Sequence, residues 1–154
     1  MTQPNDTDHT AKYLEQAVEL ATRNVGEGGG PFGALVVTAD GRVHEGVNRV
    51  TRDNDPTAHA EVVAIRAAAA ATANYDLHGA VLYASCEPCP LCLASALWAR
   101  IDRVYFAADR HGAACAGTRF VLPQAGQAVS AASIPSTPFC LRTPPTPGMA
   151  RPTT

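Results

Sequence analysis

Two short motifs about thirty residues apart constrain this chain more than any other feature of its sequence. They are Pro56-Thr57-Ala58-His59-Ala60-Glu61 and Ser85-Cys86-Glu87-Pro88-Cys89-Pro90-Leu91-Cys92. One histidine and two cysteines are typical zinc ligands, and three protein ligands leave the fourth tetrahedral position open, as in a catalytic site. Glu61 is not needed as a ligand, so it can carry a proton to and from a bound water. The fold is therefore expected to bring the two motifs together.

The spacing within each motif predicts where the helices begin. Cys89 and Cys92 are three residues apart, and Pro90 suits the first position of a helix, so both sulfurs project from one face of a helix start. The partial positive charge of that helix end favours thiolates. His59 and Glu61 differ by about 200° around a helix, so they face one site only if the helix N-terminus points at the metal. Asp55-Pro56 has the form of an N-cap followed by proline, which predicts a helix start there.

Two other interpretations of the cysteines have to be weighed. A structural zinc site would need a fourth ligand, and Cys86 is the candidate for it. An isolated Cys-x-x-Cys is also typical of a redox pair. The combination of His-x-Glu with a later Pro-Cys-x-x-Cys favours catalytic zinc, because it is the signature of zinc deaminases that act on nucleobases.

Hydrophobic periodicity predicts an α/β chain in the order α-β-β-α-β-α-β. The last two helix-strand steps imply parallel crossovers, which place helices on both faces of the sheet. Asp6, Thr7 or Asp8 is expected to cap the first helix, and the last helix is expected to be buried because it is so apolar. The expected elements are a helix over 12–25, a hairpin of 33–38 and 43–50, a helix over 58–73, a strand over 80–84, a helix over 91–100 and a strand over 103–108.

The composition changes near the C-terminus. Residues 123–154 contain seven prolines and no acidic residue, with one apolar island around Phe139. We therefore divide the chain into a core of residues 1–122, an extended arm of residues 123–142 and a disordered tail of residues 143–154.

Charge and hydropathy narrow the partners and the compartment. The net charge is −2 and Lys12 is the single lysine, so no basic stripe is present and nucleic acid is disfavoured as a partner. No run of eighteen apolar residues occurs, and the N-terminus is polar, which disfavours a membrane span or a signal peptide. Three of the five cysteines lie within seven residues, which is more typical of a metal site in a reducing compartment than of a disulfide framework. We expect a cytoplasmic protein.

From about Ala11 to Phe120, the chain resembles the cytidine deaminase superfamily, and within it the bacterial guanine deaminases. The resemblance rests on residues 29–34 (Gly-Gly-Pro-Phe-Gly-Ala), 46–50 (Gly-Val-Asn-Arg-Val), 54–62 (Asn-Asp-Pro-Thr-Ala-His-Ala-Glu-Val), the cysteine motif and Trp98-Ala99-Arg100. It implies a three-layer α-β-α fold with a mixed five-stranded sheet, and a homodimer. It also implies that the arm around Phe139 can cross to the partner and close its active site.

The same resemblance assigns roles to individual residues. It implies a Zn²⁺ ion on His59, Cys89 and Cys92, Glu61 as proton shuttle, Asn48 and the Ala60 backbone amide on the ring edge, and Phe32 lining the base pocket. The implied reaction is the hydrolytic deamination of a free aminated base. Zinc hydroxide attacks an amino-bearing ring carbon, Glu61 delivers a proton, and ammonia leaves.

The chain departs from the guanine deaminase pattern after its last core strand. Gly112 stands where an acidic residue usually reads the purine edge, and Thr118-Arg119 replaces an aromatic-acidic pair. Asp109 or His111 is the candidate substitute. Guanine or a related purine or pterin-like base is the expected substrate class. The alternatives are cytosine, a nucleoside or transfer RNA adenosine as substrate, or a catalytically silent zinc-stabilised partner subunit.

Overall fold

The computed structural model describes residues 4–109 and 127–130, with side-chain surroundings described for residues 9–109. The elements are α1 (Pro4–Gly26), β1 (Gly33–Val37), β2 (Val43–Val47), α2 (Val50–Asp53), α3 (Ala60–Thr72), β3 (Val81–Cys86), α4 (Pro90–Trp98), β4 (Arg103–Ala108) and β5 (Gln127–Ser130). From α1 to β4 this is the order expected from the sequence, with the single-turn helix α2 added.

The strands form one mixed sheet in the order β2-β1-β3-β4-β5. Strand β1 runs antiparallel to both β2 and β3, whereas β3 and β4 are parallel, with Leu82 opposite Val104. The helix α4 is the crossover between those two parallel strands, as the sequence predicted. Strand β5 pairs antiparallel with β4, and because residues 110–126 before it are not described, the five-stranded count stays a prediction.

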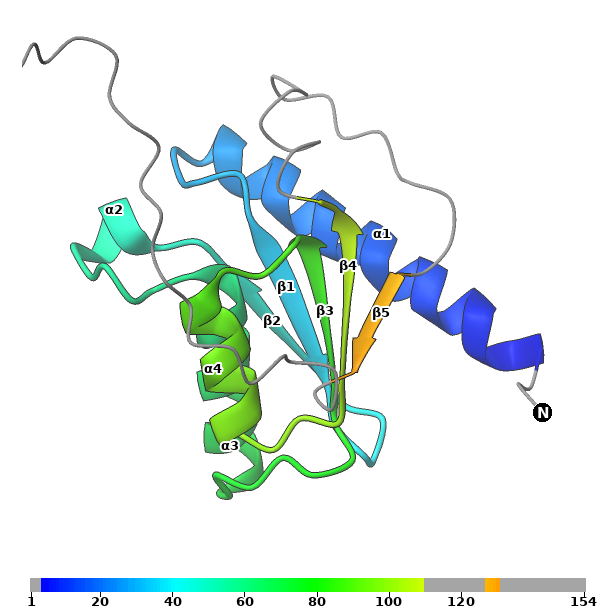
Figure 1. Cartoon of the computed structure of the whole chain (residues 1–154). Coiled ribbons are helices and arrows are strands. Elements are labelled where there is room, and N and C mark those ends of the chain that lie inside the picture. The colour runs from blue at the N-terminus through cyan, green and yellow to red at the C-terminus, as the bar shows by residue number, and fades with distance from the viewer. Residues whose placement is uncertain (1–3, 110–126, 131–154) are drawn as a thin grey trace, which may run out of the picture.

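Helices cover both faces of the sheet (Figure 1). Helix α1 packs over one face on a cluster that includes Leu35, Val81 and Tyr83. Helices α3 and α4 pack over the other face, on a cluster that includes Val36 and Leu82. Neighbouring residues of one strand thus belong to opposite layers, which is the period-two alternation of a sheet buried on both sides. The predicted three-layer α/β architecture is confirmed.

The starts of two helices differ from the sequence prediction. Helix α1 already begins at Pro4, so Asp6, Thr7 and Asp8 lie within it and do not cap it. Asp55 does not cap α3 either, because its carboxylate accepts hydrogen bonds from the Thr57 amide (2.8 Å) and hydroxyl (2.7 Å) and forms a turn instead. Helix α3 begins at Ala60, with His59 as its N-cap residue.

Burial on α1 does not follow the apolar residues, and burial on α4 differs from the prediction. On α1 the buried face includes Asn24, which is 2% exposed, whereas the neighbouring Val25 is 41% exposed. The apolar helix α4 is not buried all round. Only Cys92 and Ala96 within α4 are buried, and Trp98 is 83% exposed.

The predicted C-terminal arm (123–142) and tail (143–154) lie outside the described residues, except for the backbone of β5. Within the described part of the chain, no helix combines the length and the apolar character needed to cross a membrane.

Strand β2 and helix α3 approach closely at Gly46, and this contact generates a prediction. A Cβ atom at Gly46 would overlap the Ala60 carbonyl oxygen and the Ala64 amide nitrogen. We expect Gly46→Ala to lower the free energy of unfolding by about 1–3 kcal/mol, because backbone atoms have to move apart. Thermal melting measures the loss. Gly26→Ala is the matched control, since a Cβ atom there would have nothing within 4 Å of it. Equal melting temperatures of the two variants would contradict the account.

Candidate metal and catalytic site

Three side chains from the two sequence motifs meet at the N-termini of α3 and α4. His59 is the N-cap residue of α3, Cys89 is the N-cap residue of α4, and Cys92 lies in the first turn of α4. The His59 Nδ1 atom lies 3.5 Å from each sulfur, and the two sulfurs lie 3.5 Å apart. These three are the group of residues, within the described part of the chain, whose ligand atoms can hold a metal ion together.

The size of this triangle fits a zinc ion. Zinc–sulfur bonds of about 2.3 Å and zinc–nitrogen bonds of about 2.0–2.1 Å, at tetrahedral angles, place a sulfur and a nitrogen about 3.5 Å apart and two sulfurs about 3.8 Å apart. The observed separations of 3.5 Å agree with these values. The donor set of one imidazole and two thiols is also one that zinc prefers.

Local sequence explains why both helices start at this point. Pro90 occupies the first turn of α4 and has no amide hydrogen to lose, so the helix begins directly after Cys89. The segment before α3 is held by a hydrogen bond from the Arg49 amide to the Ala58 carbonyl (2.9 Å), which ties the residue before His59 to the segment after β2. Both helix N-termini therefore direct their partial positive charge toward the thiols.

Glu61 lies beside the cluster in the first turn of α3, and it is 8% exposed. Burial raises the pKa of its carboxyl group, and a hydrogen bond with Cys92 partly opposes that shift. A raised pKa makes the carboxylate a better proton acceptor, which suits proton transfer beside the metal ligands.

The same burial acts on Cys92. Desolvation raises the pKa of the Cys92 thiol, and the negative charge of Glu61 raises it further. A thiolate is held in such surroundings only when a cation compensates its charge. The site therefore suits a dication, and the predicted zinc cofactor agrees with this donor set and its burial.

Cys86 is separate from the three-residue cluster. It is the last residue of β3, is 7% exposed, and its sulfur lies 3.9 Å from the Asp109 carbonyl oxygen. Burial raises the pKa of its thiol. Cys86 thus packs between the ends of two strands and is not part of the group that can hold a metal.

The residues expected to bind substrate lie at the same end of the sheet, where strands begin or finish. Phe32 precedes β1, Asn48 follows β2 and Asp109 follows β4. The Asn48 amide donates to the Phe32 carbonyl (3.1 Å), so these two segments are in contact. Phe32 is 38% exposed, whereas Ala60 at the start of α3 is buried. His111 lies outside the described residues.

Sequence reasoning missed two polar side chains that support this edge. Ser85 is 1% exposed, and its hydroxyl accepts a hydrogen bond from the Gly33 amide (3.1 Å). Asn24 is buried on α1 and donates from Nδ2 to the carbonyls of Gly30 (2.8 Å) and Asn48 (2.9 Å). In the sequence, Asn24 is a polar residue next to the apolar stripe of a helix. Periodicity alone does not distinguish a buried polar residue in that position from one that faces solvent.

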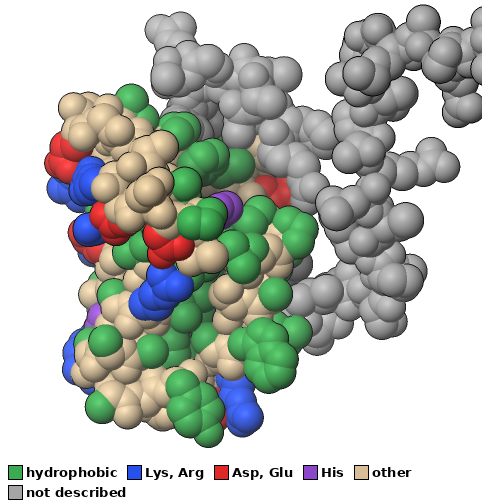
Figure 2. All heavy atoms as spheres, turned by 90° about the vertical axis from the view of Figure 1, so that its left-hand side faces the viewer, with side chains coloured by type: hydrophobic (Ala, Val, Ile, Leu, Met, Phe, Trp, Pro, Cys, Tyr) green, Lys and Arg blue, Asp and Glu red, His purple; other side chains and the backbone are tan. Residues whose placement is uncertain are grey.

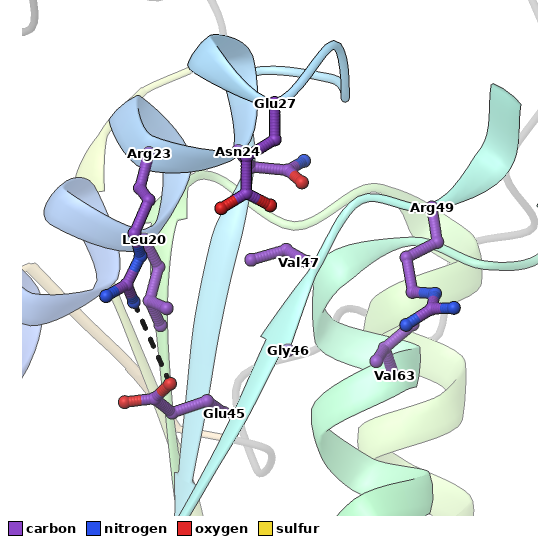
Figure 3. Close-up of a pocket in the computed structure, with 9 residues that line it drawn as sticks. All are labelled: Leu20, Arg23, Asn24, Glu27, Glu45, Gly46, Val47, Arg49 and Val63. Atoms are coloured by element: carbon purple, nitrogen blue, oxygen red, sulfur yellow. Dashed lines mark ion pairs between the residues drawn. The ribbon is translucent and has the colours of Figure 1, made fainter. Parts of the chain in front are cut away.

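A pocket lies elsewhere, between the C-terminal half of α1, strand β2 and helix α3 (Figure 3). It contains the ion pair of Arg23 with Glu45 (3.9 Å), whose side chains are both more than half exposed. None of its lining residues is a candidate metal ligand. The lining is Leu20, Arg23, Asn24, Glu27, Glu45, Gly46, Val47, Arg49 and Val63.

Comparisons with known proteins identify the family and the fold of this chain. The profile of the cytidine and deoxycytidylate deaminase zinc-binding region matches residues 7–108. Guanine deaminase of Bacillus subtilis (strain 168) is 51% identical over 106 residues, which are 68% of either chain. An X-ray structure of guanine deaminase from Bacillus subtilis superposes with a TM-score of 0.66 over 71% of either chain, at 50% identity.

A second class of relative is more distant. The tRNA-specific adenosine deaminase of Haemophilus influenzae is 38% identical over 110 residues, which are 71% of this chain and 64% of the relative. The resemblance stated from the sequence motifs, the fold class and the zinc cofactor are confirmed. The chain is a homologue of guanine deaminase and belongs to the family defined by the cytidine and deoxycytidylate deaminase zinc-binding region.

Proposed function

We propose that this protein hydrolytically removes the amino group of a free aminated heterocyclic base, guanine or a related purine or pterin-like base. One observation carries the proposal: the buried Glu61 lies directly beside the triangle of His59, Cys89 and Cys92. A purely structural metal site has no need of such a carboxyl group. The likeness to guanine deaminase supports the choice of substrate class.

In this proposal His59, Cys89 and Cys92 hold the zinc ion. When bound, zinc supplies a Lewis acid that acidifies water at neutral pH. Glu61 accepts a proton from that water and passes it to the base. An oxygen–carbon bond forms at the amino-bearing ring carbon, the carbon–nitrogen bond breaks, and ammonia leaves with the delivered proton. Glu61 returns to its starting state, so the proton balance closes in each turnover.

Substrate recognition falls to residues at the end of the sheet where β1 starts and β2 and β4 finish. The Asn48 side chain offers a donor and an acceptor, which suits a ring edge that presents both. The Ala60 backbone amide lies at the free N-terminus of α3 and can donate to a ring oxygen. Phe32 offers an apolar face for the ring, and Asp109 or His111 would read the opposite edge.

A transfer RNA adenosine deaminase is the second candidate, and the relative from Haemophilus influenzae favours it. The net charge of −2 with a single lysine argues against it, because binding a nucleic acid backbone depends on clustered cations.

We expect the protein to work in the cytoplasm, because a reducing compartment would keep the cysteine ligands as thiols.

The first test is ammonia release from a panel of free purines, pyrimidines, pterins, nucleosides and a transfer RNA anticodon stem-loop. We expect turnover on a free base and a loss of kcat by at least about 100-fold in Glu61→Gln, since the amide cannot carry the proton. Zinc content, measured by mass spectrometry, should stay at one ion per chain in that variant. Turnover of the stem-loop alone would favour the second candidate. Zinc-bound wild-type protein with no activity on any substrate would mean a silent partner subunit.

Cys92 and Cys86 are expected to differ in whether they bind zinc. We expect Cys92→Ser to reduce bound zinc by at least about tenfold, because it removes a ligand from the metal triangle. Cys86→Ser is the matched control and should keep the zinc, since Cys86 stands outside that triangle. Loss of zinc from Cys86→Ser would instead identify Cys86 as a ligand.

We also propose a homodimer formed through α4. Its exposed side chains include Leu91, Leu97 and Trp98, and the helix from Pro90 to Trp98 contains no charged residue. Hydrophobic side chains are numerous on this side of the molecule, and charged side chains lie among them (Figure 2). An uncharged apolar helix face can meet a second copy of itself about a two-fold axis without like-charge repulsion, and exposed tryptophan is typical of interface centres.

If α4 forms the dimer interface, a charge placed on it should halve the molecular mass measured in solution. We expect Trp98→Asp to convert the wild-type dimer to a monomer at micromolar concentration, as measured by light scattering coupled to gel filtration. Val43→Asp changes another exposed apolar residue, at the start of β2, and should leave the dimer intact. A monomeric wild-type protein, or a Trp98→Asp variant that remains dimeric, would contradict the proposed interface.

A further inference from the structure

We propose that Asn24 is a positioning residue that holds the segments carrying Phe32 and Asn48 at a fixed separation and thereby sets the affinity for the base. The inference rests on the proposed function, because Phe32 and Asn48 contact a base only if the protein acts on one. Asn24 itself does not belong to the metal cluster.

Every hydrogen-bonding group of the Asn24 side chain is used. Asn24 lies in the last turn of α1, close to Val47 at the end of β2 (Figure 3). Its Nδ2 group donates to the Gly30 carbonyl at 2.8 Å and to the Asn48 carbonyl at 2.9 Å. Its Oδ1 atom accepts a bond from Arg52 Nη2 at 3.2 Å. One buried amide therefore joins α1, the loop before β1, the segment after β2 and helix α2.

The two bonds from Nδ2 close a ring of hydrogen bonds around the proposed base-binding segments. The Phe32 amide donates to the Gly30 carbonyl at 2.8 Å, and the Asn48 amide donates to the Phe32 carbonyl at 3.1 Å. Asn24 completes the ring by contacting Gly30 and Asn48 from the other side. A shift of Phe32 relative to Asn48 would break a bond in this ring, so the ring fixes their spacing.

The glycines of the loop let its backbone lie directly on the two asparagines. A Cβ atom at Gly29 would overlap the Asn24 side-chain amide, and one at Gly30 would lie 2.8 Å from Asn48 Oδ1. No side chain separates this loop from the asparagines, so any movement of Asn24 is passed to the loop.

A role in general stability does not explain the choice of asparagine. The other buried residues near Asn24 on this helix include Leu20 and Ala21, which pack without polar groups. Burying an amide is costly unless each of its groups finds a partner. Asn24 finds its partners on the two segments that carry Phe32 and Asn48, which is where a positioning residue is needed.

The test uses Asn24→Asp in the full-length zinc-bound protein. Aspartate has nearly the same volume and keeps an acceptor for Arg52, but it removes both donors and directs carboxylate oxygen at two carbonyls. We expect KM for the base to rise about tenfold or more, with kcat changed less than about threefold and zinc content unchanged. We also expect hydrogen exchange at the Phe32 and Asn48 amides to accelerate about tenfold or more.

Leu14→Ala is the control for a merely structural effect. Leu14 is buried on the same helix and belongs to the cluster beneath it, with no hydrogen bond to the loop. Its truncation should lower the melting temperature while KM and the exchange of the two amides relative to the rest of the core stay at wild-type values. If Asn24→Asp does not fold, Asn24→Ser is measured in its place, since its hydroxyl keeps only one short donor.

The outcomes separate this inference from the proposed function. Wild-type KM and wild-type exchange at Phe32 and Asn48 in the Asn24 variant would overturn the inference, as would an equal rise of KM in Leu14→Ala. A wild-type protein that releases no ammonia from any free base would overturn the proposed function and the claimed effect on base affinity. The exchange rates would then still decide whether Asn24 holds the two segments together.

Discussion

Strand β2 and helix α3 meet at Gly46 without an intervening side chain, and the position of the metal ligands depends on that contact. The backbone at Gly46 lies against Ala60 and Ala64 in the first turns of α3. His59 immediately precedes Ala60 and Glu61 follows it, so the contact determines how far the imidazole and the carboxyl group stand from the sheet. The bond from the Arg49 amide to the Ala58 carbonyl fixes the same point from the other side.

The second half of the site reaches this point through the parallel crossover. Strand β3 is buried along its whole length and ends at Cys86, and Pro90 then starts α4. Because α3 and α4 cover the same face of the sheet, their N-termini come together and bring two thiols within 3.5 Å of His59 Nδ1. Burial and Glu61 both disfavour the thiolate form of Cys92, so a cation is needed to balance the charge of the assembled site. Without a metal ion, a thiolate at Cys92 would therefore be electrostatically unfavourable.

The segments that we propose to select the substrate are held by weaker and more distributed interactions. Phe32 and Asn48 lie on irregular segments, and their positions are set by main-chain hydrogen bonds and by the buried amide of Asn24. Loops on a rigid scaffold can change without disturbing the metal ligands, which explains how one zinc-binding family contains relatives that act on a free base and on transfer RNA. The departure of this chain at Gly112 and Thr118-Arg119 falls after the last strand of the predicted core.

The sequence by itself determined which three side chains can hold the metal ion and the order of helices and strands from α1 to β4, and it identified Glu61 as the proposed proton carrier. Ligand chemistry depends on residue type and short spacing, and periodicity reports which elements bury a face, so both are local properties. Only the tertiary structure decided where α3 begins, because the Asp55 carboxylate accepts hydrogen bonds from the amide and hydroxyl of Thr57 and does not cap the helix. It also decided that Asn24 is buried while Val25 is exposed, and that Trp98 faces outward. Those outcomes depend on partners far away in the chain, such as the Asn48 carbonyl, which lies 24 residues from Asn24, and no local pattern contains that information.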